Sequence, residues 1–138
     1  MREEAWVVNR EVVIRRGEGS GRGERTDVHV NAVVQEPRVE EHTTVTIIIE
    51  AKGCWYHRLY KEMEAQLANR YLRDNRCRHG LYLVGWFNCP QWDPEDRRQK
   101  TATRRDLNKT RKKLETRASE LSQGDLHIES IILDATLR

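Results

Sequence analysis

An aliphatic run that ends in two opposite charges constrains this chain more than any other feature. Residues 47–52 read Ile-Ile-Ile-Glu-Ala-Lys, and a strand over residues 43–52 would be apolar on both faces along most of its length. Such a pattern is typical of a central strand that is covered on both sides. Because alternate side chains of a strand project to the same face, Glu50 and Lys52 would project together from its end. A polar pair at the end of a core strand indicates a functional site.

Length and composition set the outer limits of the fold. The chain has 138 residues, enough for one domain over residues 1–138 with a single hydrophobic core and no disulfide staples. The sequence contains no run of about 18 apolar residues that could span a membrane, and its first four residues, Met-Arg-Glu-Glu, are too polar for a signal peptide. Three cysteines without paired spacing indicate reduced thiols. We therefore predict a cytoplasmic protein.

Hydrophobic periodicity predicts strands in the first half of the chain and more helix in the second. The expected strands are residues 6–15 with a kink at Asn9, 27–34, 43–52, 81–87 and 126–133. The expected helices cover residues 56–72, a segment that starts at Asp93, and a stripe from Leu107 to Leu121 that starts near Thr103. A strand-helix-strand order makes the third and fourth strands parallel and close neighbours. We predict an α/β fold with a mixed central sheet of about five strands flanked by helices.

Four polar side chains are expected to meet at the end of the central strand. Asp27 opens the preceding strand, and Gln66 shares the inward stripe of the helix that follows. If the second and third strands pair, Asp27 and Glu50 lie roughly 5 Å apart across the ladder. Magnesium ions bind oxygen ligands of this kind. We expect Asp27, Glu50 and the Ala51 backbone carbonyl to bind one Mg²⁺, for which Mn²⁺ would substitute.

A site of this composition suits the cleavage of phosphodiester bonds. A divalent cation stabilises the negative charge that develops on the phosphate oxygens. Lys52 would hold and polarise the attacking water, and Gln66 would exchange hydrogen bonds with that water or with the substrate. The alternative is a structural ion pair between Glu50 and Lys52 at a strand end, with Asp27 in a turn.

This combination of residues resembles the motif of the PD-(D/E)XK nuclease superfamily, which has the restriction-endonuclease-like fold. The core of that family runs helix, three-strand meander, helix, strand. Its motif has an acidic residue at the second strand, (D/E)-x-K at the third, and often a Gln on the next helix. Here the matching residues are Asp27, Glu50, Lys52 and Gln66, and the resemblance covers roughly residues 6–87. It implies a restriction-endonuclease-like core and a Mg²⁺-dependent endonuclease that hydrolyses DNA.

Two features depart from that family pattern. Thr26 stands where the name of the family has proline, and residues 1–16 read as extended rather than as the opening helix. We therefore expect the domain to be excised from a larger protein, with that helix upstream. The segments Glu-Ala-Lys-Gly-Cys-Trp-Tyr and Gly-Leu-Tyr-Leu-Val-Gly-Trp-Phe further resemble nuclease domains at the ends of large bacterial proteins, some in antiphage defence. This implies an effector module that is regulated by other domains of its parent.

Positive charge is concentrated in the last third of the chain. Between residues 97 and 117, ten lysines and arginines are opposed only by Asp106 and Glu115. Phosphate neutralisation supplies most of the sequence-independent affinity for nucleic acid, although such a block is also typical of a solvated helix face. Trp92 lies in a loop beside this block and is a candidate for base stacking. The expected nucleic-acid contacts are Arg22, Arg25, Arg70, Arg73, Trp92, Arg104, Arg105, Lys109 and Lys112.

Three functional classes remain open at this point. The first is the DNA-cleaving enzyme, for which RNA is a further candidate substrate and a homodimer would favour cleavage of both strands. The second is a non-catalytic nucleic-acid-binding module with the same fold. The third is a protein-interaction domain whose basic helix docks on an acidic partner. Metal dependence separates the first class from the others, and salt dependence separates the second from the third.

Overall fold

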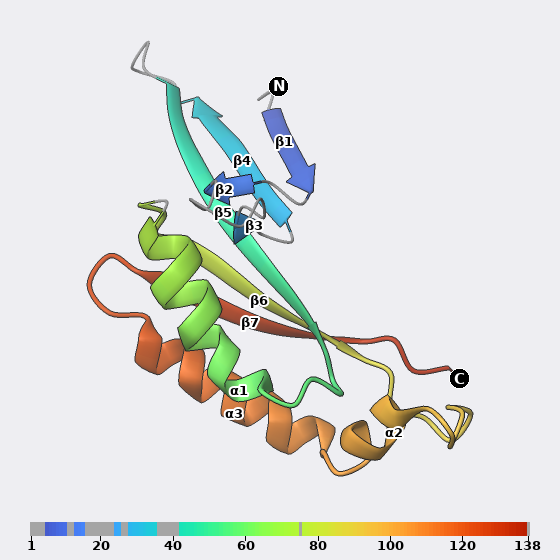
Figure 1. Cartoon of the computed structure of the whole chain (residues 1–138). Helices are drawn as coiled ribbons and strands as arrows, with labels where there is room; N and C mark the ends of the chain where they lie inside the picture. Colours follow the sequence, from blue (N-terminus) through green and yellow to red (C-terminus); the bar gives the residue numbers. More distant parts are fainter. Residues whose placement is uncertain are drawn as a thin grey trace.

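The computed structural model shows a twisted sheet with helices packed along it (Figure 1). It describes residues 5–10, 13–15, 24–25, 28–35, 42–74 and 76–137. The α/β class with a mixed sheet flanked by helices is as predicted from the sequence.

The main sheet is mixed, and its strands follow the order β1-β4-β5-β6-β7. These strands are β1 (Ala5–Arg10), β4 (Val28–Gln35), β5 (His42–Gly53), β6 (His79–Trp86) and β7 (His127–Asp134). The pairs β1–β4 and β4–β5 are antiparallel, whereas β5–β6 and β6–β7 are parallel. A separate small sheet pairs β2 (Val13–Arg15) with β3 (Glu24–Arg25). The strand that carries Glu50 and Lys52 therefore lies in the middle of the main sheet.

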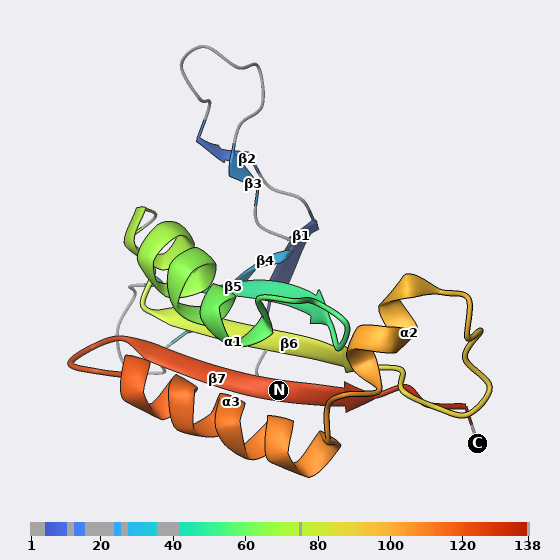
Figure 2. The same ribbon diagram turned by 60° about the horizontal axis from the view of Figure 1, so that its bottom comes forward.

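Helices connect the parallel strands. Between β5 and β6 the chain forms α1 (Leu59–Glu62), which continues as η1 (Met63–Leu72). Between β6 and β7 it forms α2 (Arg97–Ala102) and α3 (Leu107–Leu121). Figures 1 and 2 show α2 at the end of the sheet toward which β5, β6 and β7 run. The predicted crossover is confirmed, because β6 pairs directly with β5 and runs parallel to it.

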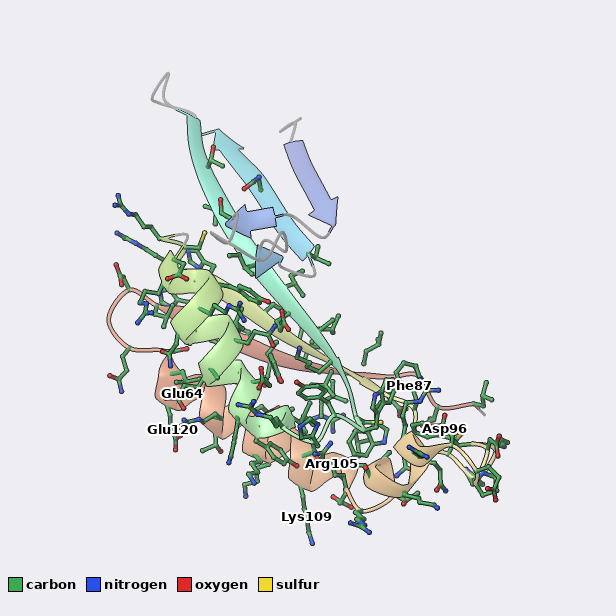
Figure 3. All side chains as sticks on the ribbon, viewed as in Figure 1. Glu64, Phe87, Asp96, Arg105, Lys109 and Glu120 are labelled. Carbon is green, nitrogen blue, oxygen red and sulfur yellow. The ribbon has the colours of Figure 1, made fainter. Side chains whose placement is uncertain are left out.

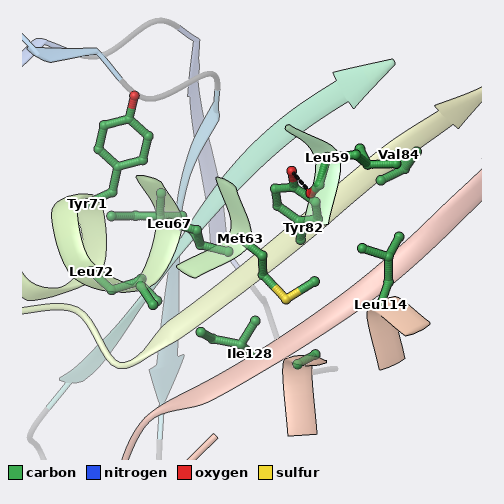
Figure 4. Packing of buried hydrophobic residues seen from close by; sticks show 12 residues of the cluster. Leu59, Met63, Leu67, Tyr71, Leu72, Tyr82, Val84, Leu114 and Ile128 are labelled. Atoms are coloured by element: carbon green, nitrogen blue, oxygen red, sulfur yellow. Dashed lines mark hydrogen bonds between the residues drawn. The ribbon is translucent and has the colours of Figure 1, made fainter. Parts of the chain in front are cut away.

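The core lies between the helices and one face of the sheet. Even-numbered residues of β5, β6 and β7 supply the sheet side, and α1, η1 and α3 supply the other side (Figure 4). The buried members include Ile48, Tyr82, Val84 and Ile128 from the strands and Leu59, Met63, Leu67, Leu72, Leu114 and Ala118 from the helices. The Tyr82 hydroxyl donates a 2.7 Å hydrogen bond to the Leu59 carbonyl inside this cluster. That bond fixes the start of α1 over the sheet.

The segment η1 is a π-helix, in which the backbone bonds run from residue i to residue i+5. Its buried side chains follow the wider turn of a π-helix. They recur every four or five residues, at Met63, then Leu67 and Ala68, then Leu72. The sequence predicts an ordinary helix from residue 56, whereas helix begins at Leu59 in the structure. Single-turn π segments occur frequently at functional sites, and this longer one covers Glu50 and Lys52.

Other element boundaries also differ from the sequence predictions. Residues 6–15 form two strands in different sheets, and Asn9 pairs with His29 inside β1 instead of marking a kink. The helices begin after Asp96 and Asp106, each of which accepts a backbone N–H bond of the first turn at 2.9 and 2.8 Å. These carboxylates cap better than the sites predicted at Asp93 and Thr103 because each reaches an N–H at the second or third helical position.

The described helices are amphipathic rather than apolar on all sides. The helix α3 buries Thr110, Leu114 and Ala118 and exposes a basic outer face. Among the residues that the structure describes, no helix has both the length and the apolar character needed to cross a bilayer.

The face of the sheet opposite the helices is less covered than the apolar pattern of β5 predicts. Ile47 and Ile49 are half-buried there, and Ala51 is exposed. Farther along this face, Ile131 is 49% exposed and Leu133 is 58% exposed. The two faces of the central strand therefore differ, and Glu50 and Lys52 lie on the covered one.

We expect Leu114→Ala to lower the free energy of unfolding by about 2–5 kcal/mol, because it removes a fully buried side chain that joins α3 to the core. The exposed Leu133 offers a matched control, and Leu133→Ala should change that free energy by less than about 0.5 kcal/mol. Urea unfolding followed by circular dichroism measures both. Equal effects of the two substitutions would contradict this account of the core.

Candidate active site

The covered face of β5 ends in a close ion pair. Glu50 and Lys52 project to the same face as the buried Ile48, as the strand period requires. The Lys52 ammonium lies 2.5 Å from a Glu50 carboxylate oxygen, and the side chains are 13% and 1% exposed. Burying a carboxylate so completely is costly without an opposite charge beside it. The two side chains therefore act as one unit.

Gln66 joins this pair from the overlying helix. Lys52 Nζ donates a 3.0 Å hydrogen bond to Gln66 Oε1, and Gln66 Nε2 donates a 2.6 Å bond to the Tyr71 hydroxyl. These two bonds set the orientation of the amide, since its oxygen must face the ammonium. Lys52 Nζ also lies 4.9 Å from the centre of the Tyr56 ring. The structure thus brings together three of the four residues that the sequence places in the site.

The loop after β5 fixes the position of Lys52. The Cys54 N–H donates to the Gly85 carbonyl of β6 at 2.9 Å, and Arg105 donates to the Cys54 carbonyl at 2.5 Å. The Trp55 ring lies directly on Gly53, where a Cβ atom would collide with it. The end of the strand is therefore tied to β6 and to the segment before α3. This rigidity holds the lysine against Glu50.

Burial keeps two titratable side chains in this region, Tyr82 and Cys54, in their neutral forms. Tyr82 pairs with Glu50 in the β5–β6 register. Burial raises the pKa of the Tyr82 phenol, and the negative charge of Glu50 raises it further. Burial also raises the pKa of the Cys54 thiol. Because a thiol attacks only as the thiolate, Cys54 is not prepared to act as a nucleophile beside this site.

Three predicted site residues lie in segments whose side chains the structure does not describe. Asp27 and Arg22 fall outside the described residues, and Arg25 is described only as backbone in β3. The nearest described neighbour of Asp27 is Val28, the first residue of β4, which pairs with Ile49. The predicted contact of Asp27 with Glu50 stays a prediction.

The described residues fit a hard divalent cation in the type of donor that they provide. Glu50 supplies a carboxylate, and Mg²⁺ in proteins is bound by one or two carboxylates together with water and substrate oxygens. Within the described part of the chain, no group of three or more His, Cys, Asp or Glu side chains could hold a metal ion. A metal centre at this place would therefore combine Glu50 with the predicted ligands Asp27 and the Ala51 carbonyl.

The predicted nucleic-acid contacts have different surroundings. Arg70, Arg73 and Arg104 are exposed, whereas the half-buried Arg105 donates to the Cys54 carbonyl and lies 5.6 Å from the centre of the Tyr60 ring. The guanidinium of Arg105 is therefore engaged by the protein itself. The exposed lysines Lys109 and Lys112 line a groove beside α3.

Trp92 belongs to an aromatic cluster at the end of the sheet where α2 lies. It meets Trp55 edge to face with ring centres 5.9 Å apart, and its indole N–H donates to Asp96 at 3.1 Å. Trp55 in turn lies 5.6 Å from Phe87, which is 41% exposed. The three rings line a cavity of about 420 Å³. Stacking of a base on Trp92 stays a prediction.

Sequence reasoning missed the three tyrosines around the ion pair. The loop after β5 places Tyr56, and the β5–β6 register places Tyr82. The sequence around either residue does not by itself indicate a site. Tyr71 lies five residues after Gln66, a spacing that brings two side chains together on a π-helix but not on the predicted α-helix. A single-sequence pattern does not distinguish these two helices.

Comparison of the chain with protein-family models, curated proteins and solved structures finds no match. The functional assignment therefore depends on the geometry of the site and on the residues themselves.

We expect Lys52→Met to lower the free energy of unfolding by about 3–5 kcal/mol, because it removes the ammonium that compensates a buried carboxylate. The double variant Glu50→Gln/Lys52→Met should lose less of the free energy of unfolding, since it leaves no buried charge. Lys100→Met, on the exposed surface of α2, is the matched control. Chemical denaturation at neutral pH measures the stability of all three variants. If Lys52→Met were as stable as Lys100→Met, the pair would not stabilise Glu50.

Proposed function

We propose that this chain is a Mg²⁺-dependent nuclease domain of the PD-(D/E)XK type, with a restriction-endonuclease-like core, that hydrolyses phosphodiester bonds of DNA. The observation that carries the proposal is the convergence of Glu50, Lys52 and Gln66 on the covered face of one strand. Their contacts of 2.5 and 3.0 Å form a single polar unit next to the buried core.

The topology supports the same proposal. The strands β1, β4 and β5 are antiparallel neighbours, a helical segment follows, and β6 then pairs parallel with β5. This order agrees with the meander, helix and strand that the resemblance implies. The pairing of Val28 with Ile49 supports a place for Asp27 near Glu50.

In the proposed reaction, this chain's side chains bind and orient the reactants. Asp27, Glu50 and the Ala51 carbonyl would hold Mg²⁺, which when bound supplies Lewis acidity and lowers the pKa of its water. Lys52 Nζ would donate a hydrogen bond to the attacking water and place a positive charge beside the phosphate. Gln66 keeps that ammonium in position through its amide oxygen, while Tyr71 fixes the amide.

The biological setting is part of the proposal. Arg104, Lys109 and Lys112, which are exposed in the last third of the chain, would bind the nucleic acid, either DNA or RNA. The domain would be a cytoplasmic effector module of a larger bacterial defence protein, regulated by other parts of that protein. Cleavage of both strands of a duplex would favour a homodimer.

We expect the protein to cut plasmid or single-stranded DNA with Mg²⁺ or Mn²⁺, and to stop when a chelator is added. Lys52→Ala should lower the rate by about 10²- to 10⁴-fold, because it removes the group that holds the attacking water. Asp27→Asn tests the second ligand while the ion pair remains intact. Gel assays measure cleavage, and circular dichroism confirms that each variant is folded.

Lys100→Ala is the matched control for loss of one lysine and should cut at the wild-type rate. Cleavage that survives both Lys52→Ala and Asp27→Asn would contradict the proposed site. Metal-independent binding without cleavage would instead favour the non-catalytic nucleic-acid-binding module. If the protein bound an acidic protein and no nucleic acid, the interaction domain would be the better assignment.

A further inference from the structure

A groove of about 520 Å³ runs between α1 with the start of η1 on one side and α3 on the other. Four lysines line it, Lys61 from α1 and Lys109, Lys112 and Lys113 from α3. We call it the lysine groove. It lies in the part of the structure where the two helices run side by side (Figure 1).

Both acidic groups of the lysine groove are paired with one arginine. Glu64 and Glu120 both pair with Arg117, which lies between them. Figure 3 shows these two carboxylates close together between the helices and Lys109 pointing away from them. Within the described part of the chain, Lys61, Lys109 and Lys112 have no acidic partner. The lining of five cations and two carboxylates has the same excess of positive charge as the whole chain, which is +3.

The spacing of these lysines suits a linear array of negative charges. Lys112 and Lys113 follow Lys109 on α3 by three and four residues, which places them about 4.5–6 Å farther along the helix axis on the same side of the helix. A nucleic-acid strand carries a phosphate at intervals of about 3.4 Å along a duplex. The lysine separations lie between one and two of these intervals, so the flexible lysine side chains can reach neighbouring phosphates of one backbone.

The floor of the groove is preorganised. Lys113 Nζ lies 3.9 Å from the centre of the Tyr60 ring, and the Tyr60 hydroxyl shares a 3.2 Å hydrogen bond with Thr110. Thr110 is buried in α3. This network ties α1 to α3 and holds one lysine in place.

The lysine groove is separate from the candidate active site. Glu64 faces the groove, whereas Gln66, two residues later, faces Lys52. Residues two apart on a helix do not share a face, so the body of the helix lies between the two sites. We therefore expect substitution of the exposed lysines Lys109 and Lys112 to leave the Glu50–Lys52 pair intact.

We propose that the lysine groove binds the sugar-phosphate backbone of a nucleic acid, as an anchoring site distinct from the residues that cut it. The choice of a nucleic acid rests on the proposed function and on the chemistry of the groove. Lysine is depleted at the centres of protein–protein interfaces, whereas a phosphate backbone is bound mainly through lysine and arginine without regard to sequence. An acidic protein is therefore the less suitable occupant.

The test measures binding of a fluorescent single-stranded DNA and of the matching duplex in EDTA, where cleavage does not occur. We expect Lys109→Ala/Lys112→Ala to weaken binding at least tenfold near physiological salt. It should also reduce the slope of log affinity against log salt by about 2, one for each phosphate that the variant no longer neutralises. The matched control is Arg97→Ala/Lys100→Ala, which removes the same charge from exposed positions of α2. This control should keep most of the wild-type affinity and the wild-type slope of log affinity against log salt.

Equal losses in the two double variants would overturn the proposal, because binding would then depend on net charge alone. Wild-type affinity in the groove variant would overturn it as well. Equally tight binding of poly-glutamate through the same lysines would overturn the assignment to a nucleic acid. The binding proposal and the nuclease proposal are tested separately. Loss of DNA affinity is measured in EDTA, whereas absence of cleavage is seen only when metal is added to bound DNA.

Discussion

The ion pair between Glu50 and Lys52 is the interaction on which the end of the structure that carries the candidate site depends. A carboxylate that is 1% exposed is tolerated in an apolar interior only because an ammonium lies 2.5 Å away. The surrounding contacts hold that ammonium: the Gln66 amide accepts from it, the Tyr56 ring lies beside it, and the loop after β5 is tied to β6. The π-helix and the end of β5 therefore both contribute contacts that hold this pair of charges.

Stability alone does not account for such a pair. Two well-packed apolar side chains of similar volume are often as stabilising as a buried ion pair, or more so, because neither charge must then be removed from water. The neighbouring residues of β5 are aliphatic, and the pair follows the buried core residue Ile48 on the same face of the strand. The cost of keeping two charges here is the physical argument for the proposed chemical role.

The strand-level part of the fold was predictable because it follows from a simple period. Alternation along residues 47–52 places Glu50 and Lys52 on one face, and the strand-helix-strand order places β6 beside β5. The inward position of Gln66 also follows from a helical repeat. Other features depend on tertiary contacts that no local pattern contains. The π-helix changes which residues share a face, so Tyr71 was missed. Asp93 and Asp96 each accept a backbone N–H at 2.9 Å, but only the bond to Asp96 lies in the first turn of a helix.

The buried Lys52 and the exposed lysines of α3 differ in the range of their electrostatic interactions. Lys52 is almost buried and engaged by Glu50 and Gln66, so its field acts at short range in a medium of low dielectric and is little affected by salt. Lys109 and Lys112 are exposed, so their attraction for a polyanion is long-ranged but screened at physiological ionic strength. A helix separates the two groups. In the proposed function, the exposed lysines would attract and hold the nucleic acid while the buried lysine keeps its position. Binding would therefore respond strongly to salt, while the chemistry at the buried pair would respond mainly to its own packing.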